Sequence, residues 1–201
     1  MNIQSPYNGS LTREQFLFHE MRITARLMSQ GLSDKEIADM IIGGNLFQFP
    51  TERTIMQQVK CCILRLHAMN NETLVRAIAE QPFEDAKQIC LFAIMKQNRL
   101  VWDFMISVIG AKYQRQDYTY KRSDITTFLM QLQEQDDNVA SWSETTIKKI
   151  GAVLSRLLIE NEYIDDAKAT RLNPVLICRV LENELRDSGD QIALSAFNCL
   201  N

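Results

Sequence analysis

The chain has 201 residues, 46% of them hydrophobic, and carries a formal net charge of −3 at pH 7. A chain of this size can bury a substantial core, and an acidic chain has no bulk attraction for nucleic acid, so any phosphate binding must come from locally clustered cations. Only 7 glycines and 4 prolines interrupt long runs of good helix formers. This composition excludes a disordered chain and predicts a predominantly all-α, multi-helix bundle.

The sequence predicts no membrane, metal or cofactor site. No apolar run reaches the roughly 18 residues needed to cross a bilayer, and the N-terminal MNIQSPYNGS lacks the basic and apolar regions of a signal peptide. We therefore expect a cytoplasmic protein without a membrane partner. The five cysteines include no C-x-x-C pair and the chain has only two histidines, which favours reduced, buried thiols over disulfides or zinc.

Residues 1–70 form the first predicted region, which is helical and similar to a helix-turn-helix. Capping patterns at Thr12 and Ser33 predict the first two helices, and a long third helix starts at Thr51. The connection before the third helix is longer than in a typical helix-turn-helix, so a pure packing role is an alternative. The exposed start of that helix carries side chains suited to base edges and phosphates, namely Arg53, Gln57 and Lys60.

Residues 71–122 form the second predicted region, a central core of three short helices followed by a linker. The run NRLVWDFMISVIG carries a wide apolar band, which is typical of a helix at the centre of a fold. The linker interleaves cations with tyrosines, a composition that suits a sugar-phosphate backbone. Its candidate contacts are Arg115, Lys121 and Arg122, and a solvated linker is the alternative interpretation.

Residues 123–201 form the third predicted region, in which two amphipathic helices follow one another as in a winged helix-turn-helix. The first covers 123–135, and Ser141 with Glu144 three residues later predicts a capping box that starts the second. The second helix should bury one apolar stripe, made of Ile147, Ile150, Leu154, Leu157 and Leu158.

The outward face of this second helix is basic and hydroxylated, as in a recognition helix that enters the major groove. Downstream, the stretch 162–177 predicts a small two-stranded β-wing with a cationic tip. A helix face with a few lysines is also common where the face only meets solvent. The candidate DNA contacts are Thr145, Thr146, Lys148, Lys149 and Arg156 on the helix, with Lys168 and Arg171 on the wing.

Four long segments carry a resemblance to a known family. LTREQFLFHEMRITARLMSQGLSDKEI, LFQFPTERTI, ICLFAIMKQNRLVWDFMISVIGAKY and LQEQDDNVASWSETTIKKIGAVLSRLL resemble the BrxA family of bacterial BREX (bacteriophage exclusion) defence systems, from about Leu11 to Leu185. The resemblance implies an all-helical fold with helix-turn-helix character, similar to a transcription antitermination fold. It also implies double-stranded DNA binding beside the methyltransferase and other BREX proteins, without catalysis.

Two functions are consistent with these patterns. The first is a non-catalytic component that binds double-stranded DNA, and the second is a protein-interaction scaffold with little or no DNA binding. The acidic net charge favours the scaffold, whereas the local basic clusters favour DNA. An enzyme is not expected, because the sequence has no nucleotide-binding glycine loop, no G-x-S-x-G and no cluster of metal ligands.

Overall fold

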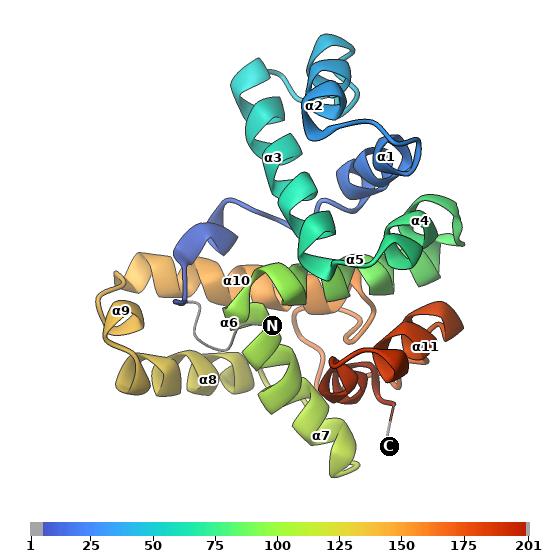
Figure 1. Ribbon diagram of the computed structural model, residues 1–201. Coiled ribbons are helices and arrows are strands. Elements are labelled where there is room, and N and C mark those ends of the chain that lie inside the picture. Colours follow the sequence, from blue (N-terminus) through green and yellow to red (C-terminus); the bar gives the residue numbers. More distant parts are fainter. Residues whose placement is uncertain (1–5, 200–201) are drawn as a thin grey trace. The chain divides into compact units, whose positions relative to one another are not determined.

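The structure is a computed structural model that describes residues 6–199. The chain folds into two compact units (Figure 1). One, the inserted unit, is Phe16–Gln97; the other, the terminal unit, contains the residues before Phe16 and those after Gln97. The three-region division at residues 70 and 122 stays a prediction about how the chain is organised.

The inserted unit consists of five helices whose starts follow from local side chains. Ser33 and Glu36 form the predicted capping box, and the side chains of Thr51 and Asn71 accept hydrogen bonds from the first turns of the helices that follow them. The helices are α1 (Phe18–Ser29), α2 (Asp34–Gly43), α3 (Glu52–Met69), α4 (Glu72–Glu80) and α5 (Phe83–Gln97).

The first helix begins later than the Thr12 capping pattern predicted. A short 3-10 helix, η1 (Gly9–Thr12), comes first, and Leu17 then turns the backbone into the left-handed region at φ 55° before α1 begins. The physical reason is tertiary, because Leu11 is buried in the terminal unit, whereas α1 belongs to the inserted unit. One continuous helix would not let these residues pack in separate units.

The terminal unit contains the remaining helices. A single helical run, Arg99–Gln114, contains a π segment at its centre, and its residue Gly110 lies against Ser195 of the last 3-10 helix. The elements are α6 (Arg99–Phe104), η2 (Met105–Gly110), α7 (Ala111–Gln114), α8 (Arg122–Gln135), α9 (Asp137–Ala140), α10 (Glu144–Glu160), α11 (Arg179–Asp187) and η3 (Gln191–Phe197).

We expect Gly110→Ala and Gly151→Ala to shift stability in opposite directions. A Cβ at Gly110 would lie 2.6 Å from Ser195 Oγ and 3.1 Å from its backbone carbon, so alanine there should cost about 1–3 kcal/mol of unfolding free energy. A Cβ at Gly151 in α10 would meet Ile125 and Leu129 at 3.6 Å, an ordinary contact, and alanine should add about 0.5–1 kcal/mol. Urea unfolding measures both, and equal effects would contradict the close packing at Gly110.

The predicted β-wing is wrong, although the all-α fold class is confirmed. The described residues contain no strand, and residues 161–178 form a loop with one isolated antiparallel bridge, Thr119↔Arg171. Side chains take up much of the loop's hydrogen bonding, since the Asn173 amide donates to Glu162 O and to Asp165 Oδ1. Such side-chain contacts replace the ladder that a two-stranded wing would need.

Candidate nucleic-acid interface

The cap of α10 differs by two residues from the predicted one. Ser143 is the N-cap, and its Oγ accepts a hydrogen bond from Thr146 N at 3.2 Å. Ser141 instead donates its hydroxyl to Asn138 O at 2.6 Å, within the turn that closes α9. The residues from Asp137 to Ala140 become a short helix rather than a plain connection, which moves the start of α10 to Glu144.

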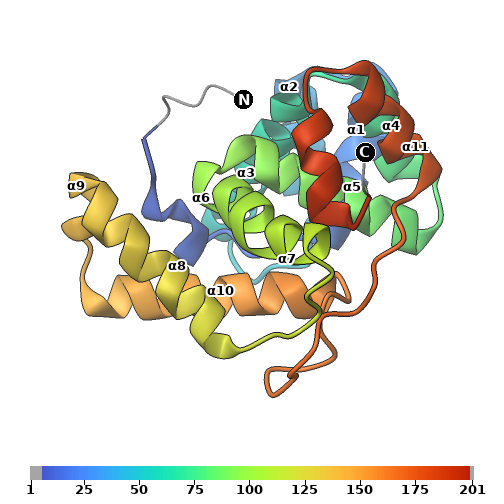
Figure 2. The same ribbon diagram turned by 90° about the horizontal axis from the view of Figure 1, so that it is seen from below.

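Helix α10 is held by an apolar stripe, as predicted. Ile150, Leu154, Leu157 and Leu158 are buried, whereas Ile147 is only half-buried. Helix α8 crosses α10 at Gly151, and Figure 2 shows α9 joining the end of α8 to the start of α10. This packing leaves the opposite face of α10 open to solvent.

The open face of α10 carries most of the predicted helix contacts. Thr145, Lys148, Lys149 and Arg156 are all exposed. Lys148 forms an exposed ion pair with Glu144 at 2.8 Å, and this hydrogen bond lowers the pKa of the Glu144 carboxyl. An exposed pair of this kind contributes little to stability and leaves the lysine able to exchange its partner for a phosphate.

Thr146 lies at the edge of this face. Its hydroxyl is 2.9 Å from Ser143 Oγ, and its methyl group packs near Gly9 of η1. Arg156, at the other end of the helix, donates a hydrogen bond to Gln15 Oε1 at 3.1 Å. The structure therefore places residues 9–15 beside α10, a neighbour that no pattern in the sequence indicated.

The loop after α10 presents Lys168 and Arg171 to solvent. The backbone N–H of Tyr120 donates to Thr170 O at 2.9 Å, and that of Leu172 donates to Tyr118 O at 2.8 Å. These bonds hold the loop alongside the segment that leads into α8, as Figure 2 shows. Two cationic segments about fifty residues apart in sequence thus lie side by side, and the predicted contacts of the α8 segment are all exposed: Arg115, Lys121 and Arg122.

Other cationic and aromatic residues of this segment point inward. Lys112 is mostly buried, forms ion pairs with Asp117 at 3.5 Å and Asp124 at 3.3 Å, and donates to Thr119 O at 3.0 Å. Tyr113 is buried and donates to Asn173 O at 2.6 Å, and burial raises its pKa. These residues hold the loop and the α8 segment in place and are not available to a sugar-phosphate backbone.

The predicted contacts on α3 belong to the inserted unit. Arg53, Gln57 and Lys60 are exposed on one helix face. The same face also exposes 59% of Met56 and 49% of Leu64, two large apolar side chains. The α3 face is therefore mixed in chemistry, unlike the open face of α10.

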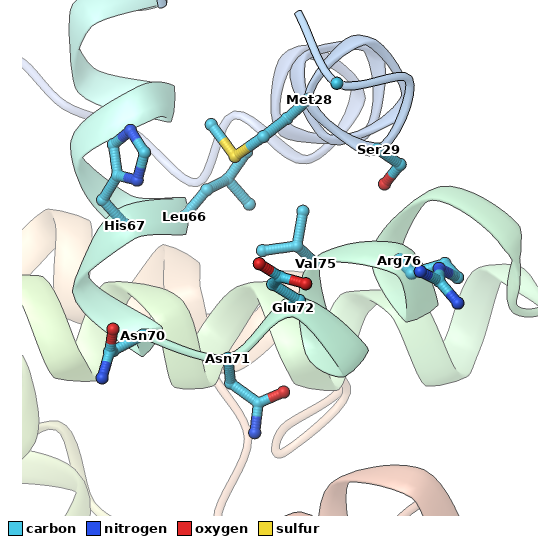
Figure 3. Close-up of a pocket in the computed structure, with 10 residues that line it drawn as sticks. Met28, Ser29, Leu66, His67, Asn70, Asn71, Glu72, Val75 and Arg76 are labelled. Carbon is cyan, nitrogen blue, oxygen red and sulfur yellow. The ribbon is translucent and has the colours of Figure 1, made fainter. Parts of the chain in front are cut away.

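The inserted unit also contains a hollow of about 520 Å³ (Figure 3). It lies among the C-terminal ends of α1 and α3 and the start of α4 and is lined by polar and apolar side chains. At its edge, His67 Nε2 lies 2.9 Å from Asp34 Oδ1, an exposed pair between α3 and α2. Its lining includes Met28, Leu66, His67, Glu72, Val75 and Arg76.

Residues 6–199 contain neither a cluster of metal ligands nor a helix that could span a membrane. Within this range no group of three or more His, Cys, Asp and Glu side chains could hold a metal ion, and no helix is long and apolar enough to cross a membrane. The cysteines are not joined in disulfides, and burial raises the pKa of Cys62 and of Cys90. Both thiols therefore stay protonated at neutral pH.

Comparison with known proteins assigns the chain to a family. The chain is 30% identical to a BREX protein BrxA from Bacillus cereus over 188 residues, 92% of this chain and 93% of that protein. It is 22% identical to a BREX protein BrxA from Escherichia coli, over 93% of this chain and 87% of that protein. The crystal structure of an uncharacterized protein from Magnetospirillum magneticum has the same fold, with a TM-score of 0.81, 23% identity and coverage of 96% and 98% of the two chains. The profile of the BrxA family matches residues 5–189, and the chain belongs to the BrxA family.

Proposed function

We propose that this protein is a non-catalytic, double-stranded DNA-binding component of a bacterial BREX defence system. Its BrxA relatives carry the name BREX protein, and membership of the family makes it a BREX component whose partners are other BREX proteins. The proposal also includes DNA as the ligand, the methyltransferase as one of the partners, and a cytoplasmic location.

One observation supports DNA binding above the others. The open face of α10 presents Thr145, Lys148, Lys149 and Arg156 together on a helix whose other side packs on α8. A helix supported in this way can lie in the major groove, where its cations reach phosphates and its hydroxyls reach base edges. The helix-turn-helix character of α8 to α10 is part of this proposal.

The loop after α10 provides a second set of proposed contacts. Lys168 and Arg171 lie beside Lys121 and Arg122 through the backbone bonds of the Thr119↔Arg171 bridge. In this position the loop would reach phosphates next to the groove that α10 occupies. Because the net charge of the chain is negative, these basic clusters can attract phosphates only over short distances.

A scaffold is the second candidate function, and the α3 face favours it. Met56 and Leu64 are exposed beside Arg53 and Lys60, and large exposed apolar side chains suit a protein surface better than a phosphate backbone. The α3 face therefore serves either as a second DNA contact or as a contact with another BREX protein.

Binding of the purified protein to a labelled duplex across a salt series tests the proposal. We expect affinity to fall as salt rises, with the slope of log K against log salt steepening by about 0.9 for each phosphate contacted. Single-stranded DNA and duplex RNA should compete poorly, since A-form RNA has a major groove too narrow for a helix. Absence of duplex binding near physiological salt would move the assignment to the scaffold.

A further inference from the structure

The N-terminal segment 6–15, called here the strap, runs along α10. A Cβ at Gly9 would lie 3.8 Å from the methyl carbon of Thr146, and Gln15 accepts its hydrogen bond from Arg156. Thr146 and Arg156 are ten residues apart, about 15 Å along the helix axis. The strap thus lies along one flank of α10 over most of the length of its open face.

Hydrogen bonds of Tyr7 hold the start of the strap in place. Its phenol donates to Asp103 Oδ2 at 2.7 Å, and the Arg99 guanidinium lies 4.2 Å from its ring centroid and 3.4 Å from the same carboxylate. Asn138 of α9 donates to the Tyr7 carbonyl at 2.6 Å. Burial and the bond to Asp103 raise the pKa of Tyr7 to about 12, so the phenol remains a donor at neutral pH. Tyr7 therefore ties the strap to α6 and α9.

Arg13 lies between Tyr7 and Gln15 in the strap and is an exposed cation at the end of η1. No ion pair is recorded for it within residues 6–199, whereas Lys148 is paired with Glu144. Gly9 lies near Thr146 and Gln15 binds Arg156, so Arg13 lies in the strap beside the stretch of α10 between these two residues. The strap therefore brings a further exposed cation to the flank of α10.

We propose that the strap is a further DNA-contacting element, in which Arg13 binds a phosphate beside α10 while Tyr7 and Gln15 act as positioning residues. The inference rests on the proposed DNA binding and deepens it. Short N-terminal arms next to a recognition helix make such contacts in other DNA-binding folds. An arm that is already held in place loses less conformational entropy on binding than a free one. The hydrogen bonds of Tyr7 should therefore increase the contribution of Arg13 to the affinity for DNA.

The first test is Arg13→Ala, with Arg179→Ala as the matched control. Arg179 is an exposed arginine of the same unit at the start of α11, a helix that packs on η3. Arg13→Ala should lower the salt slope by about 0.9 and weaken duplex binding near 0.15 M salt by roughly fivefold. Arg179→Ala should change neither quantity. An unchanged slope for Arg13→Ala would overturn the inference.

The second test separates positioning from general stability. Tyr7→Phe removes only the hydroxyl that binds Asp103, and it should weaken DNA binding in the wild-type chain but have little further effect in the Arg13→Ala chain. Hydrogen exchange should rise in residues 9–15 and stay unchanged in α10. Additive losses of affinity, or equal loosening of α10, would show that Tyr7 acts through the fold alone and overturn its positioning role.

The outcomes distinguish this inference from the proposed function. If the wild-type chain binds duplex DNA and a Lys148/Lys149 reversal abolishes binding while Arg13→Ala does not change the slope, the strap inference fails and the proposed function stands. If the wild-type chain binds no duplex, both fail.

Discussion

Reversing Lys148 and Lys149 together to glutamate is expected to remove duplex binding at physiological salt. Loss of two phosphate contacts lowers the salt slope by about 1.8, and the new carboxylates repel the phosphates as well, so affinity should fall at least about a hundredfold. Glu144, now without its Lys148 partner, adds to the repulsion. Titration of a labelled duplex at several salt concentrations measures both effects.

The matched control changes the net charge of the chain by the same amount as the Lys148/Lys149 reversal. Lys35→Glu with Arg179→Glu reverses two exposed cations on α2 and α11, outside every predicted contact. This control should retain most of the wild-type affinity. Both double variants should unfold within about 0.5 kcal/mol of the wild type, since surface substitutions of this kind rarely exceed that cost. Equal losses of binding would mean that bulk charge, and not the α10 face, governs the interaction.

Leu154→Ala is expected to destabilise the terminal unit by about 3 kcal/mol. Leu154 is fully buried at the middle of the apolar stripe of α10, so alanine leaves a cavity in the core of the terminal unit. Loss of the Leu154 side chain should also loosen α10 and thereby weaken duplex binding. Most of the binding affinity should be recovered at low temperature. Urea unfolding followed by circular dichroism gives the free energy.

Met130→Ala on α8 is the control for this substitution. Met130 is 56% exposed, so truncating it removes little buried area and should cost less than about 0.5 kcal/mol. Leu154 and Met130 both lie in the terminal unit, so the control reports on the same part of the fold. Similar costs for the two variants would contradict the burial of Leu154 in the core.

Local patterns in the sequence determined the helical fold and the orientation of α10. Helix caps at Ser33 and Thr51 depend on residues three positions away, and the 3.6-residue period separates buried Leu154 from exposed Lys149 within one helix. Both signals are short-range, so a single sequence carries them. For the same reason the residues predicted to face outward on α10 are exposed, apart from Thr146, and their contact with DNA stays a prediction.

Long-range contacts decided what the sequence left open. The strap reaches α10 through Gln15 and Arg156, which are 141 residues apart, and Lys112 turns inward because Asp124 and Thr119 surround it. The predicted wing is a loop because its backbone groups pair with Tyr118 and Tyr120 and with the side chain of Asn173, and not with one another in a ladder. Such choices depend on residues that only folding brings together, and no periodicity or cap encodes them, so the tertiary structure alone shows which cations are exposed.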